Sequence, residues 1–391
     1  MTREDILKEI LELKGSNWLL ELATGTGKSR MALEKVKSLN CDSLLIVVNR
    51  TVHKQNWAEE ITKWWPDCQI NITMTTYKSL HKYAGNYDCA IFDECHHLSE
   101  LCISYLSSYK IKHSVLCSAT VKDNKKKDFN CIFKDLVIYK KDLRDVIEDE
   151  ILPDPKVYLL PLDLRRDFPT MSIWKNPKAK GKLIECPFAL RWNFIKQKTN
   201  PVRIYCTERQ YLVDLNNQIE YWKNRYMKTR NSIAKNKWLK LCSDRLKWLS
   251  DMKTTLIEEL LNHLAGFRTL TFCNSIEQTE LLGKFCINSK NKDSVKILKD
   301  FNLKKIKHIT ACNMLNEGMN LVDCQIGIYA NLNSSETIVK QRMGRLLRHK
   351  NPILVIPYYK DSREEELVKI MLEDYNPKLV YTINNIKEIK V

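Results

Sequence analysis

The stretch Ala23-Thr24-Gly25-Thr26-Gly27-Lys28-Ser29 follows the apolar run Trp18–Leu22 and precedes the helix-forming run Ser29–Leu39. A strand, a glycine-rich turn and a helix N-terminus in this order place backbone N–H groups and the positive end of a helix dipole around a phosphate. In such a loop Lys28 reaches the β- and γ-phosphates, and the Ser29 hydroxyl ligates Mg²⁺. The sequence therefore predicts a nucleoside triphosphate site that uses Mg²⁺.

This loop departs in one place from the broad phosphate-loop pattern, G-x-x-x-x-G-K-[ST]. The position of the first glycine in that pattern is Leu22 here. The alternative interpretation is an ordinary glycine turn before a helix. The shorter form still supplies two flexible glycines, a lysine and a hydroxyl after a strand, which favours the phosphate loop.

A second polar cluster, Asp93-Glu94-Cys95-His96-His97, ends the apolar run Cys89–Phe92. Ligands of open α/β sheets bind at the carboxyl ends of the strands. We expect Asp93 to hold Mg²⁺ through water, and Glu94 to orient and deprotonate the attacking water. The two adjacent histidines lack the spacing of a tetrahedral site, so they do not indicate zinc.

Short apolar runs alternate with amphipathic stretches over residues 1–150, which is typical of a parallel α/β sheet. The runs in this part are Trp18–Leu22, Ser43–Val48, Ile70–Met74, Cys89–Phe92 and Ser114–Cys117. A second alternation follows, with runs at Thr269–Cys273, Ile306–Ala311, Ile326–Tyr329 and Ile353–Ile356. The predicted fold class is α/β, with two modules that each contain a parallel sheet.

The region between the two modules reads differently, so we divide the chain into four parts. Residues 1–150 form the first module, 151–202 a linker and irregular segment, 203–265 a helical insertion, and 266–391 the second module. Thr207–Leu264 contains no Pro or Gly and fits two long helices joined near Asn231 or Lys235. Its many basic residues indicate either a duplex-binding arm or charges that only face water. The run Lys125-Lys126-Lys127 is interpreted as a solvated loop.

Near the end of the chain, Gln341-Arg342-Met343-Gly344-Arg345-Leu346-Leu347-Arg348 places three polar side chains at helical spacing. On a helix, Gln341, Arg345 and Arg348 project from one face. Two guanidinium groups aimed across a cleft neutralise charge that develops on a γ-phosphoryl group. A basic surface helix is the alternative if the stretch is read by itself.

The order A-T-G-T-G-K-S, D-E-C-H, S-A-T and Q-R-x-G-R-x-x-R resembles a superfamily 2 helicase of the DEAD/DEAH-like type, and the resemblance covers nearly the whole chain. It is nearest to DNA fork-remodelling and branch-migration helicases, including phage-encoded ones. The resemblance implies two tandem RecA-like domains, a helical insertion at the start of the second, and ATP with Mg²⁺ as cofactors. It assigns Arg345 and Arg348 as arginine fingers, with Gln341 near the attacking water.

The resemblance also assigns coupling and nucleotide-contacting residues. Ser118-Ala119-Thr120, together with His96, resembles the motif that links nucleotide state to nucleic-acid grip. Thr310–Leu321 resembles motif V, in which Gly318 and Asn320 would contact the nucleotide. This stretch departs from the family pattern, since Cys312 replaces the usual Thr and Asn320 the usual Asp. The segment Met1–Asn17 shows no glutamine that could select adenine.

Nucleic-acid contacts are assigned in both modules by the same resemblance. In the first module they fall in Val48–Trp57 and in Thr75-Thr76-Tyr77-Lys78-Ser79. The second-module contacts fall around Thr271–Ser275, which resembles motif IV, and at the start of motif V. The candidate side chains are Arg50, Gln55, Thr75, Thr76, Lys78, Asn274, Ser275 and Thr310. Taken alone, each of the threonines, Lys78, Asn274 and Ser275 is more often a plain polar residue at a strand end.

Composition limits the partners and the compartment. Among 391 residues, 64 are Lys or Arg and 47 are Asp or Glu, a formal net charge of +17 that favours a polyanionic partner. No apolar run approaches the roughly 20 residues of a membrane span, and the 14 cysteines form no CxxC pair. We therefore expect a cytoplasmic protein, which we also expect to be a monomer, and the resemblance implies a bacterium or a phage-infected host as its source. The resemblance implies binding to DNA rather than RNA by sequence-nonspecific contacts, with replication or recombination proteins as candidate partners.

Four functions compete on the sequence alone. The first is an ATP-dependent helicase acting on DNA forks or junctions, and the second is an RNA helicase, because D-E-C-H also occurs in RNA-sensing relatives. The third is a translocase that moves on DNA without unwinding it. The fourth is a nucleic-acid-binding regulator with a vestigial ATPase, against which the intact set Lys28, Asp93, Glu94, Arg345 and Arg348 argues.

Overall fold

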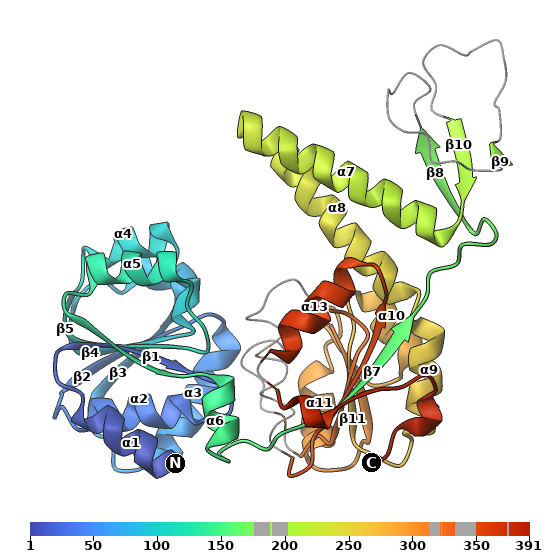
Figure 1. Ribbon diagram of the computed structural model, residues 1–391. Helices are drawn as coiled ribbons and strands as arrows, with labels where there is room; N and C mark the ends of the chain where they lie inside the picture. Colours follow the sequence, from blue (N-terminus) through green and yellow to red (C-terminus); the bar gives the residue numbers. More distant parts are fainter. Residues whose placement is uncertain (176–187, 190–201, 313–320, 322, 333–348, 374) are drawn as a thin grey trace.

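Two parallel β-sheets organise the chain in the computed structural model (Figure 1). The structure describes residues 1–175, 188–189, 202–312, 321, 323–332, 349–373 and 375–391. The first sheet belongs to residues 17–141, and the second combines strands from residues 156–162 and 269–382. Every pairing described within these two sheets is parallel, which confirms the predicted α/β fold class.

The first sheet has the strand order β3-β2-β4-β5-β1-β6. Its strands are β1 (Asn17–Leu22), β2 (Ser43–Val48), β3 (Asn71–Thr76), β4 (Asn86–Asp93), β5 (Lys110–Ser118) and β6 (Leu136–Lys141). Five of them coincide with the predicted apolar runs to within a few residues, whereas β6 was not among those runs. Because β1 and β4 both neighbour β5, the carboxyl ends of these three strands lie side by side.

Helices cover both faces of the first sheet (Figure 1). One face carries α1 (Arg3–Glu12), α2 (Lys28–Lys37) and α3 (Thr51–Trp64). The other carries η1 (Tyr77–Lys82), α4 (Glu100–Leu106) and α5 (Asp123–Ile132), with η2 (Cys95–His97) leading into α4. Strand β2 explains the two layers: its residues alternate between the two cores, as a fully buried apolar strand requires. Helix α6 (Leu143–Glu148) follows β6.

The second sheet has the order β12-β13-β11-β14-β15-β7-β16. Its strands are β7 (Lys156–Leu162), β11 (Thr269–Phe272), β12 (Cys286–Ile287), β13 (His308–Ala311), β14 (Ile326–Tyr329), β15 (Ile353–Tyr359) and β16 (Val380–Thr382). Its helices are α9 (Thr254–His263), α10 (Ile276–Leu282), α11 (Ser294–Asn302), α13 (Arg363–Leu372), η5 (Pro377–Leu379) and η6 (Ile386–Glu388). Since β7 pairs with β15 and β16, residues 151–202 are not only a linker, and the second domain begins before the helical insertion.

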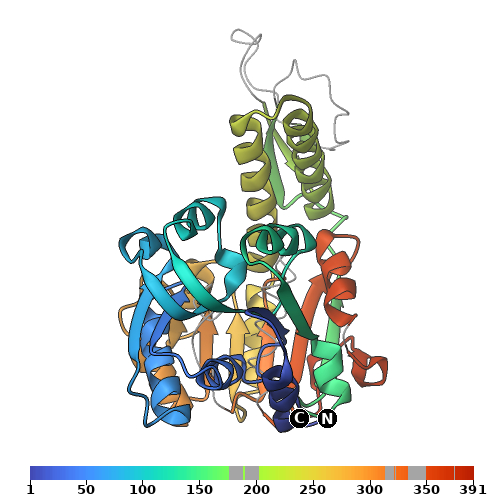
Figure 2. The ribbon, with the colours of Figure 1, turned by 90° about the vertical axis from the view of Figure 1, so that its left-hand side faces the viewer.

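Between β7 and β11 the chain forms a helical arm. Helix α7 (Glu208–Thr229) and helix α8 (Ser232–Asp251) pack against each other and extend away from the second sheet (Figures 1 and 2). The turn between them lies at Arg230, whose φ of +51° ends α7, and at Asn231, whose side chain caps α8. Thr207 and Gln210 form a capping box at the start of α7, which fixes where the arm begins.

A small antiparallel sheet precedes the arm. It consists of β8 (Met171–Lys175), β9 (Phe188–Ala189) and β10 (Val202–Cys206), in the order β8-β10-β9. The sequence predicted an irregular segment there, because its prolines and lysines obscure the short strands. Among the described residues, no helix combines the length and apolar character needed to cross a membrane.

Candidate active site

The glycine-rich loop connects the end of β1 to the start of α2. Gly25 and Gly27 have φ angles of +99° and +100°, a left-handed backbone that favours glycine. Thr26 is fully buried, and its hydroxyl donates a hydrogen bond to the Ala23 carbonyl at 2.8 Å. Helix α2 begins at Lys28, so the unpaired N–H groups of its first turn lie in the loop. This backbone has the form expected of a phosphate-binding loop.

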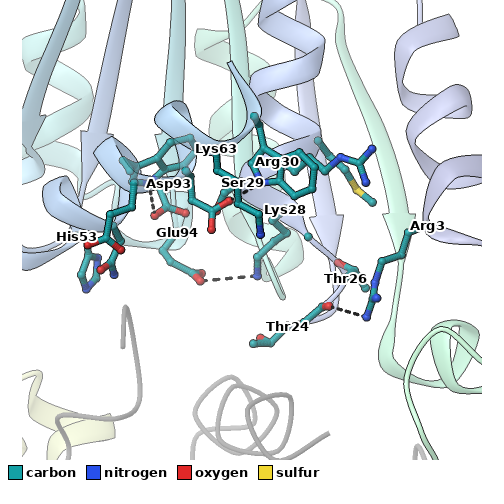
Figure 3. Close-up of a pocket in the computed structure, with 18 of the residues that line it drawn as sticks. Arg3, Thr24, Thr26, Lys28, Ser29, Arg30, His53, Lys63, Asp93 and Glu94 are labelled. Carbon is teal, nitrogen blue, oxygen red and sulfur yellow. Dashed lines mark hydrogen bonds and ion pairs between the residues drawn. The ribbon is translucent and has the colours of Figure 1, made fainter. Parts of the chain in front are cut away.

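A cavity of about 560 Å³ opens at this loop (Figure 3). Its lining includes every residue from Thr24 to Ser29, part of α3, and the acidic pair Asp93 and Glu94. Within the described part of the chain, the lining residues belong to the first domain. The predicted nucleotide-binding residues of that domain are therefore gathered around one cavity.

Two polar atoms at this cavity can form further hydrogen bonds. Lys28 Nζ lies 3.7 Å from Glu94 Oε1, and Figure 3 shows the two side chains directed at each other. Lys28 Nζ and Thr24 Oγ1 are both buried, and neither has a hydrogen-bond partner within the described part of the chain. Buried polar groups are ordinarily satisfied, so an ammonium and a hydroxyl left in this state fit a triphosphate ligand. The residues present therefore suit a nucleotide with its Mg²⁺.

The acidic pair lies beside the loop because of the sheet register. Glu21 of β1 pairs with Ser118 of β5, and Asp93 of β4 pairs with Cys117 of β5. Burial and the neighbouring Glu94 raise the pKa of Asp93 above its ordinary value, while the Trp57 indole and Lys28 lower it. Two carboxylates crowded beside one lysine are an environment that a bound cation would stabilise.

A chain of polar contacts runs from Glu94 to β5. His96 Nδ1 lies 3.3 Å from Glu94 Oε2 and 3.0 Å from Ser118 Oγ, and the Ser118 hydroxyl donates to the Thr120 carbonyl at 2.9 Å. Glu94 adopts a left-handed backbone, with φ of +48°, which turns the chain between β4 and η2. The structure thus brings the expected catalytic base together with the expected coupling residues, His96, Ser118 and Thr120.

Two lysines of α5 support this chain. Lys125 Nζ donates hydrogen bonds to the His96 carbonyl and, at 2.6 Å, to the Leu98 carbonyl. Lys126 Nζ forms an ion pair with Glu21 Oε2 at 2.6 Å. The interpretation of Lys125-Lys126-Lys127 as a solvated loop is wrong, because these residues lie in α5 and the first two bind internal acceptors. A basic run read alone contains no signal for such partners.

The candidate nucleic-acid contacts of the first domain differ in solvent exposure. Arg50, Gln55 and Lys78 are exposed, and Thr76 is partly buried, with its hydroxyl donating to Ser79 Oγ at 3.3 Å. Thr75 is fully buried within β3. Its side chain therefore does not fit the expected role, because no surface of it can reach a nucleic-acid strand.

The candidate nucleic-acid contacts of the second domain mostly form hydrogen bonds within that domain. Ser275 is 7% exposed and caps α10 by accepting a hydrogen bond from Gln278 N, and Thr310 is 3% exposed and donates to the Thr279 carbonyl at 3.0 Å. Both side chains are therefore poor candidates for nucleic-acid contact. Asn274 is partly exposed and accepts a hydrogen bond from Asn331 Nδ2 at 2.9 Å.

Five of the predicted residues lie outside the described part of the chain. They are the expected catalytic residues Gln341, Arg345 and Arg348 and the expected nucleotide contacts Gly318 and Asn320. Cys312, at the usual Thr position of motif V, is described: its thiol donates to the Asn274 carbonyl, with 3.3 Å between the two atoms. No cluster of three or more His, Cys, Asp or Glu side chains suited to a metal ion occurs among the described residues.

Trp57 is a site residue whose role the sequence did not reveal. It lies in the segment assigned to nucleic-acid contact, yet it is 2% exposed, and its indole Nε1–H donates to Asp93 Oδ2 at 2.9 Å. Tyr77 is also buried, and its hydroxyl donates to the Asp93 backbone carbonyl at 2.8 Å. Both contacts join segments that are distant in sequence, so no local pattern indicates them.

A parallel sheet with a glycine-rich loop after β1 and an acidic pair after β4 defines a nucleoside triphosphatase of the phosphate-loop class. Two family models match the chain. The model "Type III restriction enzyme, res subunit" matches residues 3–123, and the model "Helicase conserved C-terminal domain" matches residues 252–350. The two matches fall on the two domains in the order that the predicted motifs require.

Individual proteins also resemble the chain. The DNA 3'-5' translocase XPB2 of Sulfurisphaera tokodaii is 21% identical over 368 residues, which cover 87% of this chain and 76% of that protein. The structure of S. cerevisiae Dbp5 bound to RNA and ADP BeF3 has a TM-score of 0.59 at 12% identity, with 97% of this chain and 88% of that one covered. The Pyrococcus furiosus Hef helicase domain has a TM-score of 0.50 at 14% identity, with 94% and 96% covered.

These structural neighbours share the fold, and the family models cover both domains. The chain belongs to the superfamily 2 helicases, enzymes that hydrolyse ATP. Its first domain carries the phosphate loop and the acidic pair, and the prediction of tandem RecA-like domains is confirmed.

Proposed function

We propose that the protein is an ATP-driven motor that moves along DNA and unwinds or remodels forks and branched junctions. The observation that carries this proposal is the shared carboxylate of Glu94, which lies near Lys28 on one side and His96 on the other. A base that contacts both the phosphate lysine and the coupling motif can link hydrolysis to movement. The similarity to a DNA translocase over most of the chain supports DNA as the nucleic acid along which the protein moves.

In this proposal the first domain carries out most of the chemistry. Lys28 binds the β- and γ-phosphates, and Ser29 and Asp93 hold Mg²⁺, which would supply charge neutralisation at the phosphates. Glu94 orients the attacking water and accepts its proton. Gln341, Arg345 and Arg348 complete the site from the second domain, so hydrolysis requires the two domains to close on each other.

Movement needs a grip on nucleic acid that does not depend on sequence. Arg50, Gln55 and Lys78 are exposed side chains suited to phosphate and backbone contact. The arm supplies a second basic surface. Between Glu220 and Asp244 it has no acidic residue and seven basic ones, namely Lys223, Arg225, Lys228, Arg230, Lys235, Lys237 and Lys240. We assign this end of the arm, the arm tip, to the duplex next to the fork or junction.

ATPase measurements across a panel of nucleic acids test the proposal. We expect forked duplexes and four-way junctions to stimulate hydrolysis more than single-stranded DNA, plain duplex or RNA, and the chain to unwind a forked duplex. Stimulation by RNA alone would make it an RNA helicase. Stimulation by DNA without strand separation would make it a translocase, and absence of hydrolysis with every substrate would leave a regulator. Lys28→Ala serves as the inactive control.

A further inference from the structure

Helix α3 presents different side chains to the solvent and to the core. It starts at Thr51, directly after the exposed Arg50, and Gln55 is exposed on its surface. Trp57 is two residues further on, about 200° around the helix, and packs in the core between α3 and the sheet. One rigid helix therefore carries the proposed nucleic-acid contacts on its outside and the indole on its inside.

The indole N–H of Trp57 contacts the carboxylate of Asp93, which we assign to Mg²⁺ binding. Trp57 Nε1–H donates to Asp93 Oδ2 at 2.9 Å, and the ring is almost fully buried, so packing fixes the direction of this hydrogen bond. A hydrogen bond to a charged acceptor in a buried place is stronger and more directional than one between neutral groups in water. It leaves Asp93 Oδ1 as the oxygen free of the indole.

A second segment reaches the same aspartate. Tyr77 lies between Thr76 and the exposed Lys78, and its hydroxyl donates to the Asp93 carbonyl at 2.8 Å. The Tyr77 ring is also buried, so packing fixes the direction of this second hydrogen bond. Both first-domain segments assigned to nucleic acid thus hold Asp93, one by its side chain and the other by its backbone.

We propose that Trp57 is a positioning residue that holds Asp93 for Mg²⁺-nucleotide binding and transmits the position of α3 to the metal site. This inference rests on the proposed function for its second part, since α3 must contact nucleic acid. Residues that orient a metal-holding side chain change metal affinity by about 10- to 100-fold when they are replaced. A shift of α3 when Arg50 and Gln55 bind a strand would therefore change how the site holds its cation.

The variant Trp57→Phe removes the N–H donor and keeps an aromatic ring in the core. Strand β1 offers a matched control, because Trp18 is also almost fully buried and its Nε1–H donates to a different acceptor, the Lys14 carbonyl, at 3.2 Å. Trp18→Phe therefore loses a comparable indole hydrogen bond in the same core, without touching Asp93 and at a residue that does not line the described cavity. Tyr77→Phe removes the second support and should shift the same quantity in the same direction by a smaller factor.

The affinity for a fluorescent ADP analogue, measured in Mg²⁺ and in EDTA, distinguishes a positioning role of Trp57 from a role in packing alone. We expect Trp57→Phe to bind the nucleotide about tenfold more weakly in Mg²⁺ and within twofold of wild type in EDTA. Trp18→Phe should match wild type in both conditions. Equal weakening of Trp57→Phe in Mg²⁺ and in EDTA would overturn the proposal, because it would mean that Trp57 only packs the core.

The second part is tested by the Mg²⁺ concentration at half-maximal ATPase activity, with and without forked DNA. We expect forked DNA to lower this Mg²⁺ concentration in the wild type. The factor by which forked DNA lowers it should be at least threefold smaller in Trp57→Phe. An equal effect of DNA on both proteins would refute transmission through Trp57. If no nucleic acid stimulates the wild type, the proposed function fails, while the Mg²⁺ and EDTA comparison still decides the positioning role.

Discussion

At Glu94 two sets of contacts share one carboxylate. Oε1 faces Lys28 Nζ and Oε2 faces His96 Nδ1, and His96 in turn contacts Ser118. A carboxylate that is held from both sides has one preferred orientation, which a general base needs. The left-handed backbone at Glu94 places this side chain directly after the strand that ends in Asp93.

Replacing Glu94 tests the base directly. Glu94→Gln keeps the size of the side chain and removes its ability to accept a proton, so we expect turnover to fall at least 100-fold with ATP still bound. Steady-state ATPase rates and nucleotide binding measure the two effects. Lys28→Ala is the comparison, since it should lose both binding and turnover. A wild-type rate in Glu94→Gln would show that another group activates the water.

Ser118 links the base to the coupling segment. Ser118→Ala removes the hydroxyl that contacts His96 and donates to the Thr120 carbonyl. We expect the ratio of DNA-stimulated to basal ATPase to fall about tenfold, because the base and β5 would no longer move together. Ser104→Ala is a suitable control, because Ser104 is an exposed residue of α4 and its hydroxyl donates only to the Leu101 carbonyl among the contacts described for it. An unchanged ratio in Ser118→Ala would remove Ser118 from the coupling path.

At the scale of elements, the arm tip is the feature to test. Lys223, Lys228 and Lys240 are exposed on α7 and α8, and their conversion to Gln removes three charges without creating new ones. We expect weaker binding to forked DNA. We also expect the slope of log K for binding against the log of the salt concentration to become shallower by about 0.9 for each lysine that contacts a phosphate. Fluorescence anisotropy at several salt concentrations measures the slope.

A matched triple variant controls for the loss of charge alone. Lys292, Lys296 and Lys299 are exposed on or beside α11, away from the arm, and their conversion to Gln lowers the net charge by the same amount. If both triple variants weaken binding equally, the arm tip has no specific role and only the total charge matters.

A buried ion pair joins the elements at the base of the arm. Lys253 and Glu364 are both fully buried, with Nζ and Oε1 2.6 Å apart, and Lys253 also donates to the Pro357 carbonyl of β15. Lys253→Met leaves a buried carboxylate without its cation, so we expect a loss of about 3–5 kcal/mol in unfolding free energy. Denaturant titration with a probe in the second domain measures it. Lys253→Met with Glu364→Gln should recover part of the loss, and no recovery would contradict the electrostatic cause.

Local signals made much of the fold and of the nucleotide site predictable. The phosphate loop and the acidic pair each lie within one short stretch next to a strand, and β2 matches its apolar run, Ser43–Val48, without any shift. Strand β6 was missed because three of its six residues are tyrosine or lysine. The sequence also could not show which sheet β7 would join, since pairing with β15 depends on residues almost 200 positions away.

Long-range contacts account for the errors at the site. Burial makes the side chains of Thr75, Ser275 and Thr310 poor candidates for nucleic-acid contact, and a polar residue at a strand end gives no sign of its burial. The Trp57–Asp93 hydrogen bond and the Lys126–Glu21 ion pair connect residues 36 and 105 positions apart. Such pairs form only when the sheet is assembled.

At the scale of the molecule, hydrolysis should require both domains. All of the cavity lining described above comes from the first domain, so nucleotide binding should survive changes in the second. We expect Arg348→Ala to lower ATP turnover at least 100-fold and to leave nucleotide affinity within a few-fold of wild type. Turnover and fluorescent-nucleotide binding test this expectation. Equal loss of binding and turnover would mean that Arg348 is needed for folding.

Because β7 precedes the arm and β11 follows α9, both ends of the arm insertion are rooted in the second domain. With 22 residues in α7, the arm is about 30 Å long, and it acts as a lever fixed to that domain. A rotation of the second domain by roughly 10° would sweep the far end through about 5 Å, more than the 3.4 Å rise of one base pair. If the arm tip contacts the duplex as proposed, a small rotation of the second domain would therefore move that contact by more than one base pair.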